Sequence, residues 1–390
     1  MNRFLKVLLT LFVVLALAAL YVLNPRLPTP DGEQSASLYQ PGTLRITREP
    51  VALTDTSRAT PPNGDFRGSA ERNLDGFIWY PEAREAGPFP LIVYSHGFMS
   101  SVAEAEYVVD FLVPKGYAVV AVDYPLSHGG APGGPTVTDV LNQAGDVSFV
   151  IDSMLARNAD AQDSLHGLLD PSRIAAVGLS LGGMTTQLAA YHRDERDRRL
   201  AAAVSIAGPS EALERAFFQT TDIPFLMIAG SSDAIVPYEA NAAPIPDKVD
   251  NSLLVTLDDA SHTGFASVAS TFMRWFNHPD ALVCPMLLDG LEGESGDRDK
   301  PMLEPDPSVN IVASNTAPCT MDSFDRSMRP GKQQMLTRLA LYAFLEMSFS
   351  SDADRRTVMN QYLTVQFARE NPSASVEGEW GTQVRSSLAP

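Results

Sequence analysis

The stretch RIAAVGLSLGGM (residues 173–184) decides the fold that this sequence predicts. An apolar run ends at the motif G-L-S-L-G, and the residues after it have the pattern of a helix. A strand that turns sharply into a helix at Ser180 holds the serine hydroxyl clear of the backbone. Gly178 and Gly182 have no Cβ that could clash at so tight a corner. The stretch therefore predicts a nucleophilic serine at a strand-to-helix turn.

Short apolar runs alternate with longer helical patterns on both sides of this turn. Continuous apolar strands separated by helices are typical of a mostly parallel sheet covered on both faces. The sequence thus predicts an α/β fold, with strands expected at 44–49, 76–81, 90–97, 117–125, 173–180, 200–208, 224–230 and 252–260 and helices at 104–116, 137–156 and 332–349.

Two residues further along the chain supply the partners that a serine nucleophile needs. A serine hydroxyl is a poor nucleophile without a base, and a histidine base needs a carboxylate to orient it. At a nucleophile turn of this kind, the acid and then the histidine follow the serine in chain order. Asp233 and His262 each lie just beyond a predicted strand, at the edge where parallel sheets hold their ligands. The prediction is a catalytic triad of Ser180, Asp233 and His262.

Other histidines and acids fit these roles less well. His96 and His128 lie upstream of Ser180, in the wrong chain order, and three more histidines lie in helical or loop contexts without a strand before them: His166, His192 and His278. Asp258 and Asp259 lie too close to His262, and Asp222 lies at the opposite sheet edge.

Acyl transfer also needs two N–H groups aimed at the negative charge that develops on the carbonyl oxygen. One is expected from Leu181 at the N-terminus of the helix, where free donors point outward. The other is expected from Phe98, in the loop after the strand at 90–97. We expect His96 to support that loop rather than to act as a base. The predicted chemistry requires no metal and no organic cofactor.

Composition excludes some classes of protein. The chain has 390 residues, a formal net charge of −18 and a hydrophobic content of 45%. The hydrophobic content permits a large core, and the negative charge argues against a nucleic-acid partner, because nucleic-acid binders carry basic patches.

The N-terminus carries Arg3 and Lys6 before an uncharged apolar run at residues 7–23. Two interpretations lead, an uncleaved membrane anchor and a cleaved signal peptide, and a buried helix of the fold is a third. Both leading interpretations export the remainder, since basic residues before an apolar run hold that end in the cytoplasm. We therefore expect a periplasmic or other extracytoplasmic location, with membrane contact through residues 7–23 if they are retained.

The sequence divides into five parts. We expect a signal or anchor, a Pro- and Ser-rich linker, a hydrolase domain, an insertion within that domain and a C-terminal tail, at 1–23, 24–40, 41–370, 278–330 and 371–390 respectively.

The insertion contains Cys284 and Cys319, which in an exported protein suggest one disulfide, with two reduced thiols as the alternative. It also holds acidic side chains that could bind calcium but lack the spacing of a known calcium loop, so a solvated loop is favoured. These are Asp289, Glu292, Glu294, Asp297 and Asp299.

Several motifs together resemble the α/β-hydrolase superfamily: PLIVYSHGF, GYAVVAVDYP, RIAAVGLSLGG, IAGSSDAIVP and ASHTGF. Within it the chain resembles predicted dienelactone hydrolases and platelet-activating-factor acetylhydrolase-like serine esterases. The resemblance implies an α/β-hydrolase fold with a mostly parallel sheet of the eight-stranded type. The insertion after the predicted catalytic histidine, at 278–330, departs from the simple pattern of that family. Dienelactone hydrolases use a cysteine nucleophile, so Ser180 favours an ordinary serine esterase.

The function expected is hydrolysis of carboxylic esters through an acyl-enzyme, on a small-molecule or lipid ester. Amidase, thioesterase, polyesterase and acyltransferase activities are alternatives on the same fold, because function depends on the site rather than on the fold. An exported binding protein without catalysis is a further alternative.

Overall fold

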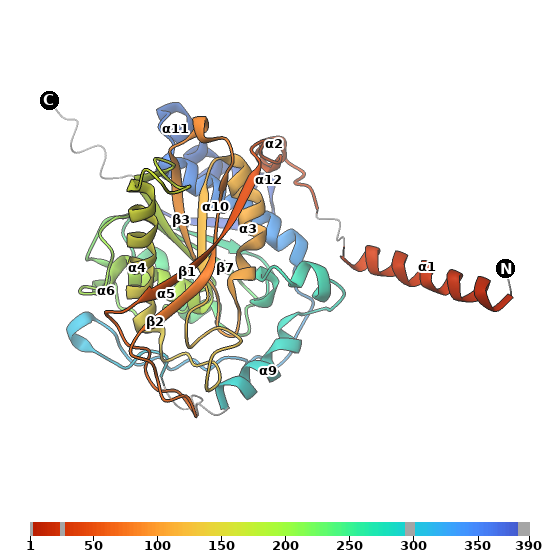
Figure 1. Cartoon of the computed structure of the whole chain (residues 1–390), viewed down its shortest axis with the longest axis horizontal. Helices are drawn as coiled ribbons and strands as arrows, with labels where there is room; N and C mark the ends of the chain where they lie inside the picture. Colours follow the sequence, from red (N-terminus) through yellow and green to blue (C-terminus); the bar gives the residue numbers. More distant parts are fainter. Residues whose placement is uncertain (1–2, 24–27, 293–300, 381–390) are drawn as a thin grey trace.

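The computed structural model describes residues 3–23, 28–292 and 301–380. A nine-stranded sheet forms the centre of the described part, in the order β1-β2-β4-β3-β5-β6-β7-β8-β9 (Figure 1). Its strands are β1 (Ile46–Asp55), β2 (Arg72–Pro81), β3 (Phe89–Ser95), β4 (Ala118–Val122), β5 (Leu169–Leu179), β6 (Leu200–Ile206), β7 (Phe225–Gly230), β8 (Ser252–Leu257) and β9 (Ala374–Gly378).

The six strands from β4 to β8 run parallel, whereas β1, β2 and β9 pair antiparallel at the two ends of the sheet. The predicted mostly parallel α/β sheet is therefore confirmed. Strand β9 lies inside the segment expected as a tail (371–390). Its sequence, ASVEG, has no apolar run, and it forms a strand because it pairs with the free edge of β8.

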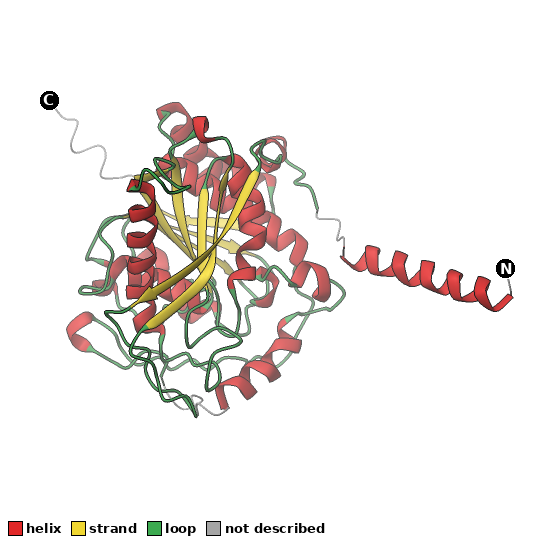
Figure 2. Ribbon diagram, in the orientation of Figure 1, coloured by secondary structure: helices red, strands yellow, loops and turns green. Residues whose placement is uncertain are grey.

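Helices cover both faces of the sheet, except for α1, which extends away from it (Figure 2). They are α1 (Arg3–Leu23), α2 (Glu33–Tyr39), α3 (Glu106–Leu112), α4 (Val140–Ala159), α5 (Leu181–Tyr191), α6 (Arg215–Phe218), α7 (Tyr238–Asn241), α8 (Ile245–Lys248), α9 (Asp280–Glu292), α10 (Pro330–Phe349), α11 (Ala353–Gln361) and α12 (Phe367–Glu370). Short 3-10 and π turns join them at Arg84–Ala86, Val102–Ala105, Val113–Lys115, Thr263–Phe265, Ala269–Met273, Pro307–Val309 and Tyr362–Gln366.

Strand β3 shows how the two faces are built. Its side chains point alternately to opposite faces, as in any strand. Ile92 and Tyr94 pack in one core with α3 and α10, whereas Leu91 and Val93 pack in the other with α4 and α5. Because both faces are covered, β3 is apolar along almost its whole length.

The N-terminal region differs from the linker that was expected. Residues 24–27 lie outside the described part, but 33–39 form α2, whose Ser35 and Leu38 are buried. The Glu370 carboxylate accepts hydrogen bonds from the N–H groups of Gln34 and Ser35, at 3.1 and 2.7 Å. This part of the expected linker is therefore attached to the domain.

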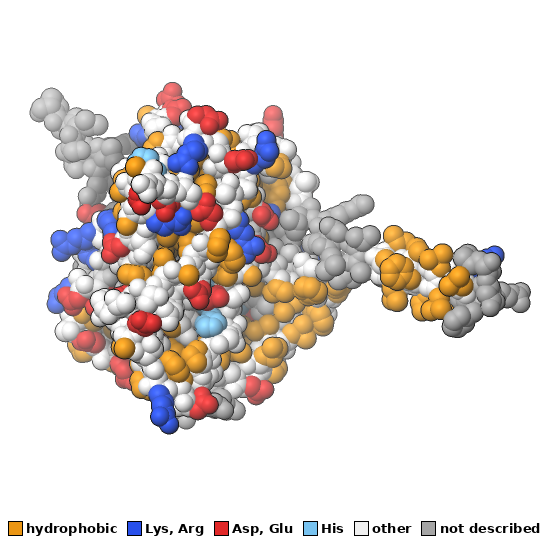
Figure 3. Space-filling model, in the orientation of Figure 1, with side chains coloured by type: hydrophobic (Ala, Val, Ile, Leu, Met, Phe, Trp, Pro, Cys, Tyr) orange, Lys and Arg blue, Asp and Glu red, His pale blue; other side chains and the backbone are white. Residues whose placement is uncertain are grey.

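Exposed apolar side chains, among them Val7, Phe12 and Tyr21, lie along α1 (Figure 3). Within residues 3–23, 28–292 and 301–380, no helix combines the length and the apolar character needed to cross a membrane.

The carboxyl ends of the parallel strands meet at one edge of the sheet. The register pairs Ser95 of β3 with Gly178 of β5, and Gly230 of β7 with Leu257 of β8. The loops that leave these strands carry all the side chains predicted to be catalytic.

Candidate active site

Ser180 lies at the turn between β5 and α5. Its backbone is left-handed, with φ of 57° and ψ of −121°, and its N–H donates to the Ile206 carbonyl at 2.8 Å. A Cβ at Gly178 would lie 2.0 Å from the Gly182 carbonyl oxygen, and one at Gly182 would lie 2.0 Å from that of Ser95. Only glycine fits at either position, because a Cβ essentially never approaches backbone so closely. The two glycines thus permit the turn that holds Ser180 at the sheet edge.

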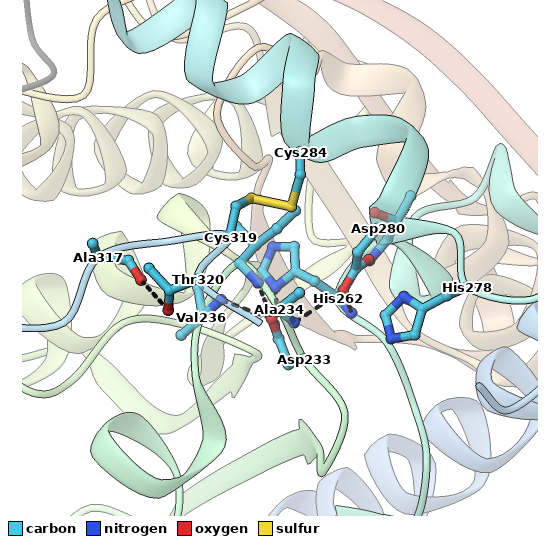
Figure 4. Close-up of a disulfide and its surroundings, with 12 residues drawn as sticks. Asp233, Ala234, Val236, His262, His278, Asp280, Cys284, Ala317, Cys319 and Thr320 are labelled. Carbon is cyan, nitrogen blue, oxygen red and sulfur yellow. Dashed lines mark hydrogen bonds and ion pairs between the residues drawn. A yellow bond between two sulfur atoms is a disulfide. The ribbon is translucent and has the colours of Figure 1, made fainter. Parts of the chain in front are cut away.

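Asp233 and His262 form a buried pair at the same edge (Figure 4). His262 Nδ1 lies 2.7 Å from Asp233 Oδ2. The other carboxylate oxygen of Asp233 accepts the N–H groups of Ile235 and Val236, at 2.9 and 2.7 Å. Since Nδ1 is occupied by the acid, Nε2 is the ring atom left to act as a base.

The charge of Asp233 controls the protonation of His262. Burial opposes the charged ring, but the negative charge of Asp233 and its hydrogen bond outweigh this, so the pKa of His262 is raised above its usual value of 6.5. A raised pKa makes the imidazole a stronger proton acceptor.

Ser180 and His262 are not hydrogen-bonded to each other: within the described part of the chain, the Ser180 hydroxyl has no hydrogen-bond partner. A Cβ added at Gly97 would lie 3.3 Å from both Ser180 Cβ and a Glu104 carboxylate oxygen. Glu104 in turn acts electrostatically on His262. The three predicted residues therefore share one sheet edge, and contacts between a nucleophile and its base often tighten only when substrate binds.

The two predicted oxyanion donors border one cavity with Ser180. Neither the Phe98 nor the Leu181 N–H has an acceptor among the hydrogen bonds of the described residues. The loop is fixed on both sides of Phe98, because Gly97 N–H donates to Glu104 at 3.0 Å and Met99 N–H donates to the Ser127 carbonyl at 2.9 Å. Both N–H groups are therefore unpaired within the described part of the chain.

Sequence reasoning missed Glu104, which supports this loop. Its carboxyl is buried and also accepts a hydrogen bond from the Tyr94 hydroxyl at 3.1 Å. Burial raises the pKa of Glu104 to about 7. His96 supports the loop from within, since its Nε2 accepts the N–H of Tyr124 at 3.0 Å and burial lowers its pKa to about 4. His96 is thus a neutral structural residue, in the role that the sequence suggested.

Asp280, at the start of α9, was missed as well. It is completely buried and joins the loops that carry Asp233 and His262. One of its oxygens accepts the N–H groups of Ala234 and His262, at 3.1 and 3.0 Å, and the other accepts that of Thr263 at 2.7 Å. In the sequence Asp280 is only an acidic residue in the first turn of a helix, and no local pattern indicates this contact.

A disulfide joins Cys284 of α9 to Cys319 (Figure 4). The N–H of Cys319 donates to the Ala234 carbonyl at 2.6 Å, one residue after Asp233. The insertion is therefore attached directly to the loop that carries the predicted acid.

The acidic residues of the insertion do not assemble into a cation site in the part of the chain that the structure describes, where no group of three or more potential metal ligands occurs. Glu294, Asp297 and Asp299 lie outside the described residues.

Comparison with known proteins now identifies the family. The model of a family described as PETase, PET hydrolase-like, matches residues 66–277. The chain belongs to this family. The match includes Ser180, Asp233 and His262 and ends just before the insertion. This family match confirms the predicted α/β-hydrolase fold and the predicted hydrolysis of carboxylic esters.

Curated relatives agree with this membership. Cutinase est1 of Thermobifida alba is 27% identical over 51% of this chain, which spans 64% of that cutinase's length. A bis(hydroxyethyl) terephthalate hydrolase of Streptomyces coelicolor is 24% identical over 67% of this chain and 80% of its own length. Cutinase 2 of Thermobifida cellulosilytica is 26% identical over 60% of this chain and 89% of its own length.

Proposed function

We propose that this PET hydrolase-like protein cleaves carboxylic esters with Ser180 as nucleophile, His262 as general base and acid, and Asp233 as the group that orients His262. The observation that carries the proposal is the buried 2.7 Å contact between Asp233 and His262, on the sheet edge that also holds the left-handed turn at Ser180. Such a turn exposes the serine hydroxyl at the end of its strand.

The reaction proceeds in two halves. His262 Nε2 accepts the Ser180 hydroxyl proton as Oγ bonds to the ester carbonyl carbon, and the tetrahedral intermediate forms. The N–H groups of Phe98 and Leu181 then donate to its negative oxygen. The bond to the alcohol oxygen breaks, and His262 gives its proton to the departing alcohol. A water molecule, deprotonated by His262, releases the acid and restores Ser180.

The electrostatics of the site favour these steps. Asp233 holds the Nδ1 proton and stabilises the imidazolium that forms when Ser180 attacks. The hydrogen bonds from Ile235 and Val236 occupy the other oxygen of Asp233 and fix the plane of its carboxylate. The base is therefore oriented before substrate arrives.

A polyester or its fragments is the second candidate substrate. The names of the relatives, two cutinases and a bis(hydroxyethyl) terephthalate hydrolase, favour it. Family membership gives less support to amide, thioester or acyl-transfer chemistry.

We also propose that the protein works outside the cytoplasm. The disulfide between Cys284 and Cys319 supports this location, because disulfides persist in oxidising compartments. The basic residues and the apolar run before residue 24 are consistent with export through a signal peptide.

Hydrolysis of p-nitrophenyl butyrate by the purified protein tests the proposal. We expect Ser180→Ala and His262→Ala to reduce kcat by at least about 10³-fold, and Ser180→Ala to retain the wild-type melting temperature. Ser267→Ala is the matched control, since Ser267 is in the loop after His262, and it should keep full activity. If wild type and Ser180→Ala hydrolyse a broad ester panel equally slowly, the protein is a binding protein on a hydrolase fold.

A further inference from the structure

A small apolar cavity lies beside Ser180 and extends beneath the insertion. Its volume is about 130 Å³. The side chains next to the nucleophile are Phe98, Leu181 and Met184, all from the part of the chain that matches the family. The cavity is therefore continuous with the proposed oxyanion hole.

The opposite wall comes from residues beyond the family match. We call α9 and residues 301–320 the roof. Leu287 and Leu291 of α9, together with Met302 and Leu303, line the cavity from this side. The roof is thus a feature of this chain that limits the space beside its nucleophile.

The roof is fastened to the domain at several points. The Glu211 carboxylate accepts hydrogen bonds from the Ser314 hydroxyl and the N–H groups of Asn315 and Thr316, at 2.6, 3.1 and 3.1 Å. The N–H of Val312 donates to the Ala212 carbonyl at 2.9 Å. The disulfide described above joins α9 to the other end of the roof. So many attachments make the roof a fixed wall.

The position of His262 decides which half of an ester enters the cavity. The departing alcohol must receive a proton from His262, so it lies next to the imidazole. His262 does not line this cavity, whereas Ser180 and the two oxyanion donors do. The acyl group, whose carbonyl carbon bonds to Ser180, therefore occupies the cavity, and the alcohol lies outside it.

Building on the proposed function, we propose that this cavity is an acyl pocket for one short aliphatic chain or one aromatic ring, and that the roof sets this limit. An engineered protein cavity of about 150 Å³ holds a single benzene molecule. A cavity of similar size beside Ser180 takes an acyl group of that size and excludes the middle of a long chain. The alcohol, by contrast, can be large.

Two ester series measured below the critical micelle concentration separate the two halves. In the first, the p-nitrophenyl leaving group is fixed and the acyl chain grows from acetyl to decanoyl. In the second, the acyl group is butyryl and the alcohol grows from methyl to naphthyl. We expect kcat/KM to fall at least about tenfold between butyryl and octanoyl esters. Variation along the alcohol series should be smaller than this.

Roof variants then test the cause. Leu287→Ala should raise the octanoyl-to-butyryl ratio of kcat/KM about tenfold, and Leu287→Phe should lower the butyryl-to-acetyl ratio. The matched control is Met286→Ala, one residue away on α9, because the Met286 side chain is 64% exposed and should leave both ratios unchanged. Ratios within one variant are independent of the amount of folded enzyme.

The proposal is wrong if wild type hydrolyses octanoyl and butyryl esters equally well, or if neither substitution at Leu287 moves the ratios. Either result, with butyrate still hydrolysed, leaves the proposed esterase function intact. If Ser180→Ala and wild type do not differ on any ester, the proposed function fails first, and the acyl pocket fails with it.

Discussion

Asp280→Asn removes the charge that joins the two catalytic loops. The carboxylate accepts three backbone N–H groups, from Ala234, His262 and Thr263, and no other side chain in the described residues contacts both loops in this way. An asparagine side chain has one acceptor oxygen, and its amide nitrogen can only donate, so the NH₂ group must face at least one of these N–H groups. At least one hydrogen bond is lost, and the others become neutral.

The structure gives the size of the effect. A hydrogen bond to a charged group contributes about 1.5–3 kcal/mol, and a neutral one about 0.5–1.5 kcal/mol. One lost and two weakened bonds, partly offset by no longer burying a charge, give a loss of about 2–4 kcal/mol in the free energy of unfolding. Because the backbone that carries His262 is held less firmly, we also expect kcat to fall roughly 10–100-fold.

Urea unfolding and p-nitrophenyl butyrate kinetics on the same preparations measure both effects. Asp289→Asn is the matched control, since Asp289 is exposed on the same helix and should behave as wild type. If Asp280→Asn unfolds within about 0.5 kcal/mol of wild type and keeps its kcat, Asp280 does not hold the catalytic loops, and our account of the insertion is refuted.

Three further predictions follow from the site and its surroundings. Replacing both Cys284 and Cys319 by serine should reduce the free energy of unfolding by roughly 3–4 kcal/mol, which is the loop-entropy value for their sequence separation of 35 residues. A smaller change, measured by urea unfolding, would show that the roof is held without the disulfide. Gly182→Ala should yield little soluble protein, because the new Cβ clashes with backbone at 2.0 Å, whereas Gly130→Ala, where the nearest atoms belong to a histidine side chain, should express normally. The raised pKa of His262 keeps the ring protonated to higher pH, and only the neutral ring accepts a proton, so the pH profile of kcat/KM should fall on the acid side with a midpoint above pH 6.5. A midpoint below pH 6.5 would contradict the influence of the neighbouring carboxylate.

The central sheet and the candidate catalytic residues could be predicted from the sequence because both depend on local patterns. The apolar runs of the parallel strands are continuous, and Ser180 has a glycine two residues away on each side. Asp233 and His262 could be found because each follows such a run, in the chain order that a nucleophile turn implies.

The rest depends on contacts between distant segments. Strand β9 forms only because β8 offers an unpaired edge, and α2 is fixed by Glu370, which lies 335 residues after Ser35. Asp280 and Glu104 look like ordinary helix residues in the sequence. Their roles arise from where the fold buries them, which no spacing along the chain reveals.

Covalent labelling tests the central claim most directly. The protein is treated with a fluorophosphonate, which phosphonylates an activated serine, and the modified peptide is mapped by mass spectrometry. We predict one adduct, located on Ser180, that forms rapidly in wild type, much more slowly in His262→Ala and not at all in Ser180→Ala. An unlabelled wild-type protein, or an adduct on any other serine, would contradict the proposal that Ser180, His262 and Asp233 act as one catalytic unit.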